Sequence, residues 1–441
     1  MKSMSLAPVD YVFTGPMSCP VTFAFSYPKR LDAARVQQSI SPLLAAIPWL
    51  GGRLRATAEH GYAYALDDHP VTTLEVARSH KSFYELSGSE AVRVVRSADG
   101  QPLMHARITH TPNGSVLGVS MSHALVDGFS FFLALSRWAA CARGEAIDAP
   151  PMRRLLQPSE AQVRAAAEEL TPGLLLERSG LFWSEPRAEV RALPQPLSLQ
   201  LRASQIDALV ADAQRHVSVK LRQNDVLTAW LWRTYGSAWW SSEDASDVYM
   251  SCPVDVRRLL GAENQNAFGC TICGASVRAS SSELRTAPLG ELALRIQKGV
   301  SAVFADDWGE RVAPLEALRR RHGIAATHAV HLRHPQRGML VTNMSRLPLA
   351  ELDFGSGAPV GVRLFSEIDA MAAILPARDG VTIDVFGPRS NVVSLPKRSA
   401  AGLITAAVAG PAPQAPRLPT SAFVTAAVAG PAPQAPRSTR R

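Results

Sequence analysis

A strand–turn–strand–helix pattern between residues 103 and 144 constrains the fold of this chain more than any other stretch. Two apolar runs, 103–108 and 115–120, lie on either side of an Asn113-Gly114 pair, and Asn-Gly between such runs is typical of a β-hairpin. From Phe129 to Trp138, apolar side chains then recur at helical spacing. A hairpin followed by a helix with one apolar face predicts a mixed α/β fold for this half of the chain.

The loop between the second strand and this helix carries His123, Asp127 and Gly128 in the spacing HxxxDG. A histidine can take a proton from a hydroxyl near neutral pH. Asp-Gly favours a tight turn, and Gly128 is interpreted as the residue that permits it. The end of a strand is also where loops display catalytic groups. The motif alone still fits a histidine with a packing role, because roughly a few per cent of chains this long match it by chance.

Other periodic segments extend the mixed pattern along the chain. Asp32 is a suitable helix cap, and Pro42 should bend or restart the helix that follows. We further expect a helix at 159–170 that Thr171-Pro172-Gly173 closes, a helix at 204–216 that begins at Ser204, a helix from Asn224 onward and a helix at 289–303. Strands are expected at 248–253, 338–343 and 381–386.

Short motifs outside the hairpin also matter, because their order along the chain resembles the BAHD acyltransferases. This family of acyl-CoA-dependent O- and N-acyltransferases is defined by HxxxDG and a later DFGWG. The second motif is altered here to Asp353-Phe354-Gly355-Ser356-Gly357, after a stretch at 341–348 similar to T-S-W-x-R-L-P. Weaker matches lie at 6–10 (L-S-x-x-D), 47–54 (P-L-A-G-R-L), 225–233 (V-L-T-A-x-x-W-R), 253–258 (V-D-x-R) and 267–270 (F-G-N).

The resemblance implies a domain organisation. It predicts an α/β fold of two similar chloramphenicol-acetyltransferase-like domains, each a mixed sheet flanked by helices, with the active site at their interface. We place the first domain at 1–177, a crossover linker rich in Pro, Arg and Ser at 178–199, and the second domain at 200–394. The remainder, 395–441, is predicted to be a disordered tail, because a Pro- and Ala-rich segment, Thr405–Arg417, recurs as Thr425–Arg437.

Composition excludes several other classes of protein. The 441 residues are 46% hydrophobic and 19% charged, as in globular proteins. No apolar run approaches the roughly 18–20 residues of a membrane span, and the start lacks the apolar region of a signal peptide. The net charge of +8 forms no basic stripe, so nucleic-acid binding is not expected. Five cysteines do not form a disulfide framework, and Cys270-x-x-Cys273 without a second pair predicts no metal site. We expect a cytoplasmic protein.

The resemblance also implies a reaction and its catalytic residues. His123 would act as general base on a hydroxyl or amine of a small-molecule acceptor, without a covalent acyl-enzyme, and then protonate the leaving thiolate. Thr342 would help to stabilise the tetrahedral intermediate. Acyl-CoA would be the donor co-substrate, with no bound cofactor, and the enzyme would act as a monomer.

Several motif residues are expected to shape the site without touching substrate. By resemblance, Asp127 turns away from His123 and pairs with Arg257. The motif residues Asp353, Gly355 and Gly357 would form a structural loop that lies outside the pocket and shapes the CoA-binding region. The chain departs from the family pattern at Ser356, Met344 and Cys270, where Trp, Trp and Asn are usual.

Two alternative functions stay open. Condensation domains of peptide synthetases use an acyl group on a carrier protein, but they usually carry a second His where this chain has Ser122. A non-catalytic homologue could keep the fold as a binding module, and the three departures favour that alternative, whereas His123 argues against it.

Overall fold

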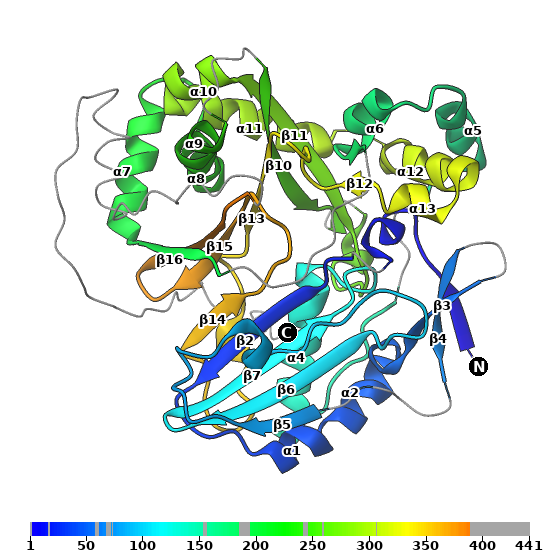
Figure 1. The fold of residues 1–441 in the computed structure, drawn as a ribbon, viewed down its shortest axis with the longest axis vertical. Coiled ribbons are helices and arrows are strands. Elements are labelled where there is room, and N and C mark those ends of the chain that lie inside the picture. Colours follow the sequence, from blue (N-terminus) through cyan, green and yellow to red (C-terminus); the bar gives the residue numbers. More distant parts are fainter. Residues whose placement is uncertain are drawn as a thin grey trace, which may run out of the picture.

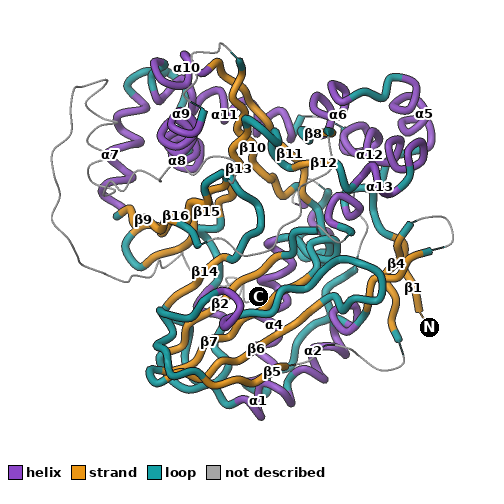
Figure 2. Tube along the Cα trace, in the orientation of Figure 1, coloured by secondary structure: helices purple, strands orange, loops and turns teal. Residues whose placement is uncertain are grey.

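The computed structural model describes residues 2–15, 18–57, 61–67, 72, 74–152, 157–184, 195–240, 246–257, 260–305 and 307–388. Two large sheets and the helices around them make up two halves of the molecule (Figure 1). The tube in Figure 2 separates the strands of these sheets from the helices that cover them. The predicted mixed α/β character is confirmed. The predicted tail, 395–441, and residues 185–194 of the predicted linker lie outside the described residues.

The first sheet lies in the half that carries HxxxDG. Its strands occur in the order β14 (Gly361–Leu364), β2 (Val21–Tyr27), β7 (Gly114–Met121), β6 (Met104–Thr111) and β5 (Leu74–Arg78). Helices α1 (Ala33–Gln38), α2 (Ile40–Ala46) and α4 (Gly128–Ala142) pack together on it. A short helix, α3 (Gly88–Ala91), and a small sheet of β1 (Lys2–Ser5), β4 (Tyr62–Leu66) and β3 (Arg53–Ala56) complete this half.

The second sheet has the order β11 (Ile272–Ser280), β10 (Asp247–Asp255), β13 (Gly338–Asn343), β15 (Met371–Ala377), β16 (Gly380–Phe386) and β9 (Leu197–Leu201). Helices α7 (Ala203–Gln214), α8 (Gln223–Leu231) and α11 (Leu289–Val303) contact its strands. Near them lie α9 (Ser237–Trp239) and α10 (Ser281–Thr286). A further group comprises α5 (Glu160–Glu168), α6 (Pro172–Ser179), α12 (Trp308–His322), α13 (Ile324–Thr327) and the pair β8 (Phe182–Trp183) and β12 (Val330–His331).

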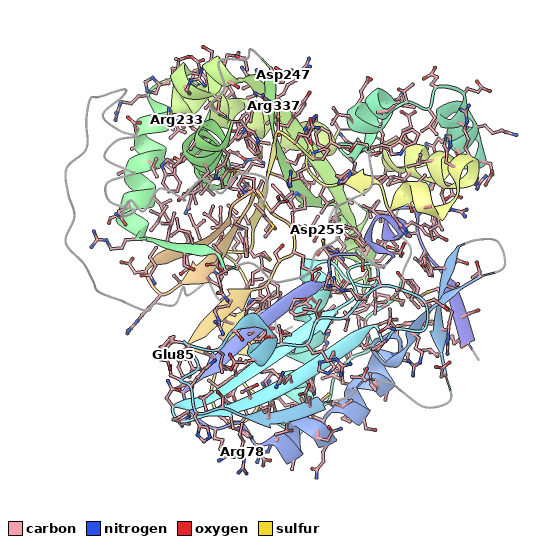
Figure 3. All side chains as sticks on the ribbon, viewed as in Figure 1. Arg78, Glu85, Arg233, Asp247, Asp255 and Arg337 are labelled. Carbon is pink, nitrogen blue, oxygen red and sulfur yellow. The ribbon has the colours of Figure 1, made fainter. Side chains whose placement is uncertain are left out.

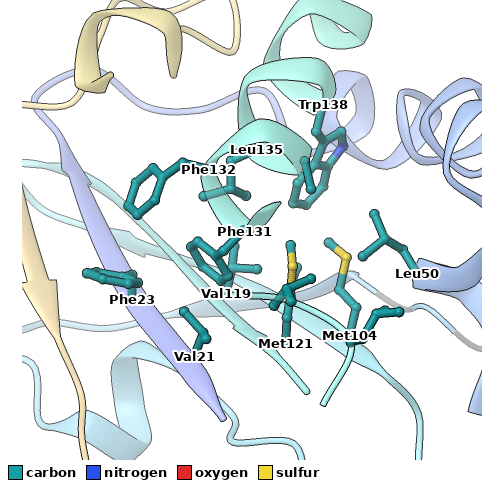
Figure 4. Packing of buried hydrophobic residues seen from close by; sticks show 14 of the residues in the cluster. Val21, Phe23, Leu50, Met104, Val119, Met121, Phe131, Phe132, Leu135 and Trp138 are labelled. Carbon is teal, nitrogen blue, oxygen red and sulfur yellow. The ribbon is translucent and has the colours of Figure 1, made fainter. Parts of the chain in front are cut away.

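The predicted hairpin and helix are confirmed. Strands β6 and β7 pair antiparallel from Met104↔Met121 to Thr111↔Gly114. The loop after β7 ends at Asp127, whose Oδ1 accepts a hydrogen bond from the Ser130 N–H at 2.9 Å and so caps α4. Figure 4 shows α4 packed on this sheet through a buried apolar cluster that includes Phe23, Phe131 and Trp138. This arrangement positions the HxxxDG loop at one end of a buried strand.

Helix ends follow the predicted capping chemistry at some positions and not at others. Asp32 caps α1, and the helix restarts as α2, with Pro42 in its first turn, where no intrahelical N–H is needed. Thr171 does not simply close α5, because its Oγ1 accepts from Leu174 N and begins α6. Ser204 and Asn224 are not caps, because each lies inside its helix. Helix α7 begins directly after Arg202 and helix α8 directly after Arg222, and these two arginines occupy the cap positions.

The chain crosses between the two halves after the DFGSG motif. Strand β14 pairs antiparallel with β2, from Gly361↔Ser26 to Leu364↔Phe23, and so belongs to the first sheet. The next strand, β15, returns to the second sheet. The predicted region 200–394 therefore contributes a strand to the region predicted as 1–177, as Figure 1 shows where β14 lies beside β2.

No helix within the described ranges combines the length and hydrophobicity of a membrane-crossing segment.

Candidate active site

A cavity of about 1060 Å³ lies between the two halves and brings His123 and Thr342 to one space. Its walls come from α4, from β10 and β13, and from the loops before β2 and after β14, at 19–20 and 365–368. The two residues predicted to be catalytic arrive from different sheets, His123 after β7 and Thr342 near the end of β13. Asp255, labelled in Figure 3, lines the cavity near the middle of the molecule.

The His123 ring is held against an aromatic side chain. It stacks on Phe13, with ring centroids 3.9 Å apart and ring planes inclined by 8°. Burial lowers the pKa of His123 from its usual 6.5, although backbone groups of His123 and Val126 and the Asp127 charge oppose the shift. Its Nδ1 atom is buried and has no partner at hydrogen-bond geometry among the described residues. The imidazole is therefore neutral near pH 7, the state that a general base needs.

Hydrogen bonds fix the loop that carries this histidine. The Ser122 N–H donates to the Leu103 carbonyl at 2.9 Å, and the Ser122 and Ser97 hydroxyls lie 2.6 Å apart. On the other side of His123, the Tyr64 hydroxyl donates to the Ala124 carbonyl at 2.5 Å. These groups are buried, so the loop has little freedom to turn the imidazole.

The predicted ion pair between Asp127 and Arg257 is present. Arg257 Nη2 lies 2.6 Å from Asp127 Oδ2, and the two side chains are 2% and 1% exposed. The same Oδ2 accepts from the Thr271 N–H at 3.0 Å, while Oδ1 caps α4 through Ser130. None of the contacts found among the described residues joins this carboxylate to the His123 ring. Asp127 thus ties the loop to the second half of the molecule.

Arg257 uses the rest of its guanidinium to hold the backbone around Cys270. Its Nε donates to the Ala267 carbonyl at 2.9 Å and its Nη2 to the Gly269 carbonyl at 2.7 Å, while Nη1 donates to Asp255 at 2.8 Å. Burial raises the pKa of the Cys270 thiol well above 9.0, so a neutral thiol stands where the family has Asn.

Thr342 lies where β13 approaches the cavity. It pairs with Ala373 of β15, and the next residue, Asn343, donates through Nδ2 to Asn224 Oδ1 of α8 at 2.7 Å. Met344, a departure from the family pattern, lines the same cavity. The end of β13 is therefore fixed from both sides, and Thr342 lines the cavity.

The DFGSG loop folds around the Asp353 carboxylate, apart from the residues that line the cavity. Asp353 Oδ1 accepts from Gly355 N at 2.7 Å and from Gly357 N at 2.8 Å, and both glycines have positive φ, +91° and +96°. Phe354 is buried edge-on against Trp138, with centroids 5.3 Å apart. These bonds are made with Ser356 in place of the usual Trp.

Gly128 is the exception among the motif glycines. It is the first residue of α4, its φ is not in the left-handed region, and an added Cβ would meet nothing within 4 Å. The explanation that glycine is needed here for a tight turn is therefore wrong. Gly128 does line the cavity, where a side chain would take space from a ligand.

Sequence reasoning missed two features of this site. Phe13, which stacks on His123, carried no signal because its partner lies far along the chain. Phe129, Leu133 and Arg137 all line the cavity from one face of α4, and their spacing of four residues is a helical signal that could have identified that face. Among the described residues, no group of three or more His, Cys, Asp or Glu side chains is arranged to hold a metal ion.

Comparison with known proteins gives consistent relatives. A family model described as the Transferase family matches residues 1–399. A hydroxycinnamoyltransferase of Narcissus pseudonarcissus is 27% identical over an alignment of 294 residues that covers 63% of this chain. That match spans 64% of the relative's own length, less than two thirds. Acyltransferase GLAUCE of Arabidopsis thaliana is 22% identical over 395 residues, covering 81% of each chain.

Solved structures agree in fold. F. graminearum TRI101 complexed with coenzyme A and deoxynivalenol has a TM-score of 0.68 at 15% identity, covering 87% of this chain and 95% of its own. Vinorine synthase has a TM-score of 0.61 at 17% identity, covering 87% and 90%. The predicted fold class, two chloramphenicol-acetyltransferase-like α/β domains, is confirmed by this likeness.

Proposed function

Since this chain belongs to the Transferase family, the BAHD acyltransferases, we propose that it transfers an acyl group from acyl-CoA to a hydroxyl or amine of a small molecule. The observation that carries the proposal is the place of the His123 imidazole on the wall of a cavity of about 1060 Å³ between the two halves, where burial lowers its pKa and favours the neutral form. A cavity of this size can hold a donor arm and an acceptor together. The arginines at 137, 222 and 346 also line it, which suits a donor that carries phosphates.

The proposed reaction uses His123 twice. Its imidazole removes the proton of the acceptor O–H or N–H while the acceptor atom attacks the thioester carbonyl carbon. The tetrahedral oxyanion that forms accepts a hydrogen bond from the Thr342 hydroxyl. The intermediate then collapses, the C–S bond breaks, and the imidazolium returns its proton to the leaving thiolate. Proton, acyl group and charge balance without a covalent acyl-enzyme.

Asp127 has a positioning role in this proposal. Its carboxylate is occupied by Arg257, Thr271 and the start of α4, which supports a histidine that works without a carboxylate partner. Arg257, Asp353, Gly355 and Gly357 are likewise assigned to the scaffold around the cavity. The monomeric state and the cytoplasmic location stay predictions.

The test is thiol release from a panel of acyl-CoA thioesters with alcohols and amines, for wild type and His123→Ala. Loss of the base is expected to lower kcat/KM by about 10²–10⁴-fold. His80→Ala is the matched control, because His80 is exposed and distant in sequence from the cavity residues. Equal activity of wild type and His123→Ala would refute the catalytic assignment.

Two further arms separate the alternatives. The same acyl group is offered on CoA and on a loaded carrier protein, and turnover with the carrier alone would indicate a condensation-type enzyme. Inactivity of wild type on the whole panel would favour a binding module.

A further inference from the structure

A second, smaller cavity lies directly behind Phe13 and is apolar. It measures about 20 Å³, and we call it the apolar annex. Its walls combine Val12 and Phe13 before β2, Ile272 and Cys273 of β11, and Val312 and Leu315 of α12. These residues belong to one buried hydrophobic cluster that joins the two halves of the molecule.

The annex adjoins the catalytic cavity. The two share the wall residues Cys252, Pro253, Ile272, Leu332 and Leu340. Phe13 connects the annex to the proposed base, because its ring lines the annex and also stacks on the His123 imidazole at 3.9 Å. If the thioester carbonyl of the donor lies beside His123, the acyl chain attached to it therefore has an apolar space next to it.

Apart from the Arg311 guanidinium, the side chains of the annex wall are uncharged. Burial raises the pKa values of Cys252 and Cys273 to about 12, so both thiols are neutral. The Ser179 hydroxyl donates to the Arg311 carbonyl at 2.5 Å, and Arg311 Nη1 donates to the Arg178 carbonyl at 3.0 Å. A cationic or hydroxylated group would lose its hydration here, whereas a hydrocarbon would gain by leaving water.

The size of the annex selects among hydrocarbons. A volume of about 20 Å³ is room for roughly one or two water-sized spheres. The end of an alkyl chain fits such a space, but an aromatic ring does not fit without displacing the packed wall. Resting on the proposed function, we infer that the donor is an unbranched aliphatic acyl-CoA whose terminal carbons occupy the apolar annex, with Leu315 limiting the chain length.

The experiment measures kcat/KM for saturated acyl-CoA donors from acetyl to dodecanoyl, with p-coumaroyl-CoA as the aromatic comparison. Wild type should show a defined optimum length, with a gain of about fourfold for each methylene up to that optimum. Leu315→Ala removes three carbons from the annex wall, so the optimum should move to donors longer by about three carbons. Val312→Ala, a smaller truncation, should move it by fewer carbons.

Leu318→Ala is the control. Leu318 lies on the same helix and is equally buried in the same cluster, but it does not line the annex. Each profile is a ratio of kcat/KM values within one preparation, so a loss of folded protein leaves it unchanged.

The outcomes separate this inference from the proposed function. Inactivity of wild type on every donor contradicts the acyl transfer itself. Activity with p-coumaroyl-CoA above all aliphatic donors overturns the inference alone. Unchanged profiles for both Leu315→Ala and Val312→Ala, or a shift for Leu318→Ala, overturn it as well.

Discussion

His123 is buried and stacks on Phe13, and no carboxylate of the described residues is hydrogen-bonded to its ring. Burial therefore dominates its pH behaviour, although the Asp127 charge opposes the effect. Because burial lowers its pKa below 6.5, the neutral form that accepts a proton persists to more acidic pH than for an exposed histidine. We predict that kcat/KM is constant above this pKa and falls below it, with the acidic limb centred below pH 6.5. Phe13→Ala should admit water and move the limb upward. A pH–rate profile of both proteins checks this, and a wild-type limb at or above pH 6.5 contradicts it.

Asp127 and Arg257 form a buried pair whose members depend on each other. Removing only Arg257 leaves the Asp127 carboxylate, 1% exposed, without its charged partner, and such changes cost about 3–5 kcal/mol. We predict that Arg257→Met lowers the free energy of unfolding by this amount, and that Asp127→Asn in the same chain recovers part of the loss. Urea denaturation of the single and double variants measures the coupling. Additive losses would mean that the pair does not act as a unit.

At the scale of elements, the motif glycines divide into two kinds. Gly355 has φ +91° in the DFGSG loop, whereas Gly128 begins α4 with open space around its Cα. We predict that Gly355→Ala lowers stability by about 1–2 kcal/mol because of left-handed backbone strain. Gly128→Ala should leave stability unchanged or raise it slightly, since Ala is the better helix former. Thermal denaturation compares the two, and equal losses would refute the distinction.

The predictability of an element depended on where its partners lie. The helix expected at 289–303 has those bounds as α11, because an apolar stripe repeats along it. The hairpin β6–β7 carried its own turn signal. Strand β14, by contrast, has four residues of mostly intermediate burial and pairs with β2 at the other end of the chain, so no local pattern marked it. The predicted caps Ser204 and Asn224 were wrong for a related reason: the observed cap positions are Arg202 and Arg222, which are not among the usual capping residues.

The site also contains some features that a local sequence pattern predicts and others that depend on contacts between distant parts of the chain. The HxxxDG spacing pointed to His123, and family resemblance supplied the pairing of Asp127 with Arg257, which the structure bears out. No sequence rule brought Phe13 to His123 or assembled the apolar annex from η1 (Asp10–Phe13), β11 and α12, because those contacts arise only when the two halves pack together.

At the scale of the whole molecule, strand β14 ties the two halves into one structure. Arg363 of β14 is half-buried and acts electrostatically on Asp384 of β16, in the other sheet. Asp384 also accepts a hydrogen bond from the Ser198 hydroxyl of β9 at 2.5 Å. A carboxylate is therefore buried where the sheets of the two halves approach each other.

Asp384 should make the stability of the molecule depend on pH in an unusual direction. Burial raises its pKa from 3.8 to about 6 in the folded protein. The native state then binds more protons than the unfolded chain between these values, so this group's contribution to stability falls as pH rises from about 4 to about 6 and stays low above. We predict that Asp384→Asn, which keeps an acceptor for Ser198, raises the free energy of unfolding at pH 7 by about 1–3 kcal/mol and leaves it unchanged at pH 4. Asp379→Asn, in the exposed turn between β15 and β16, removes the same charge and should have little effect at either pH. Urea denaturation at both pH values measures the difference, and a loss of stability at pH 7 for Asp384→Asn would show that its attraction to Arg363 outweighs the cost of burying the charge.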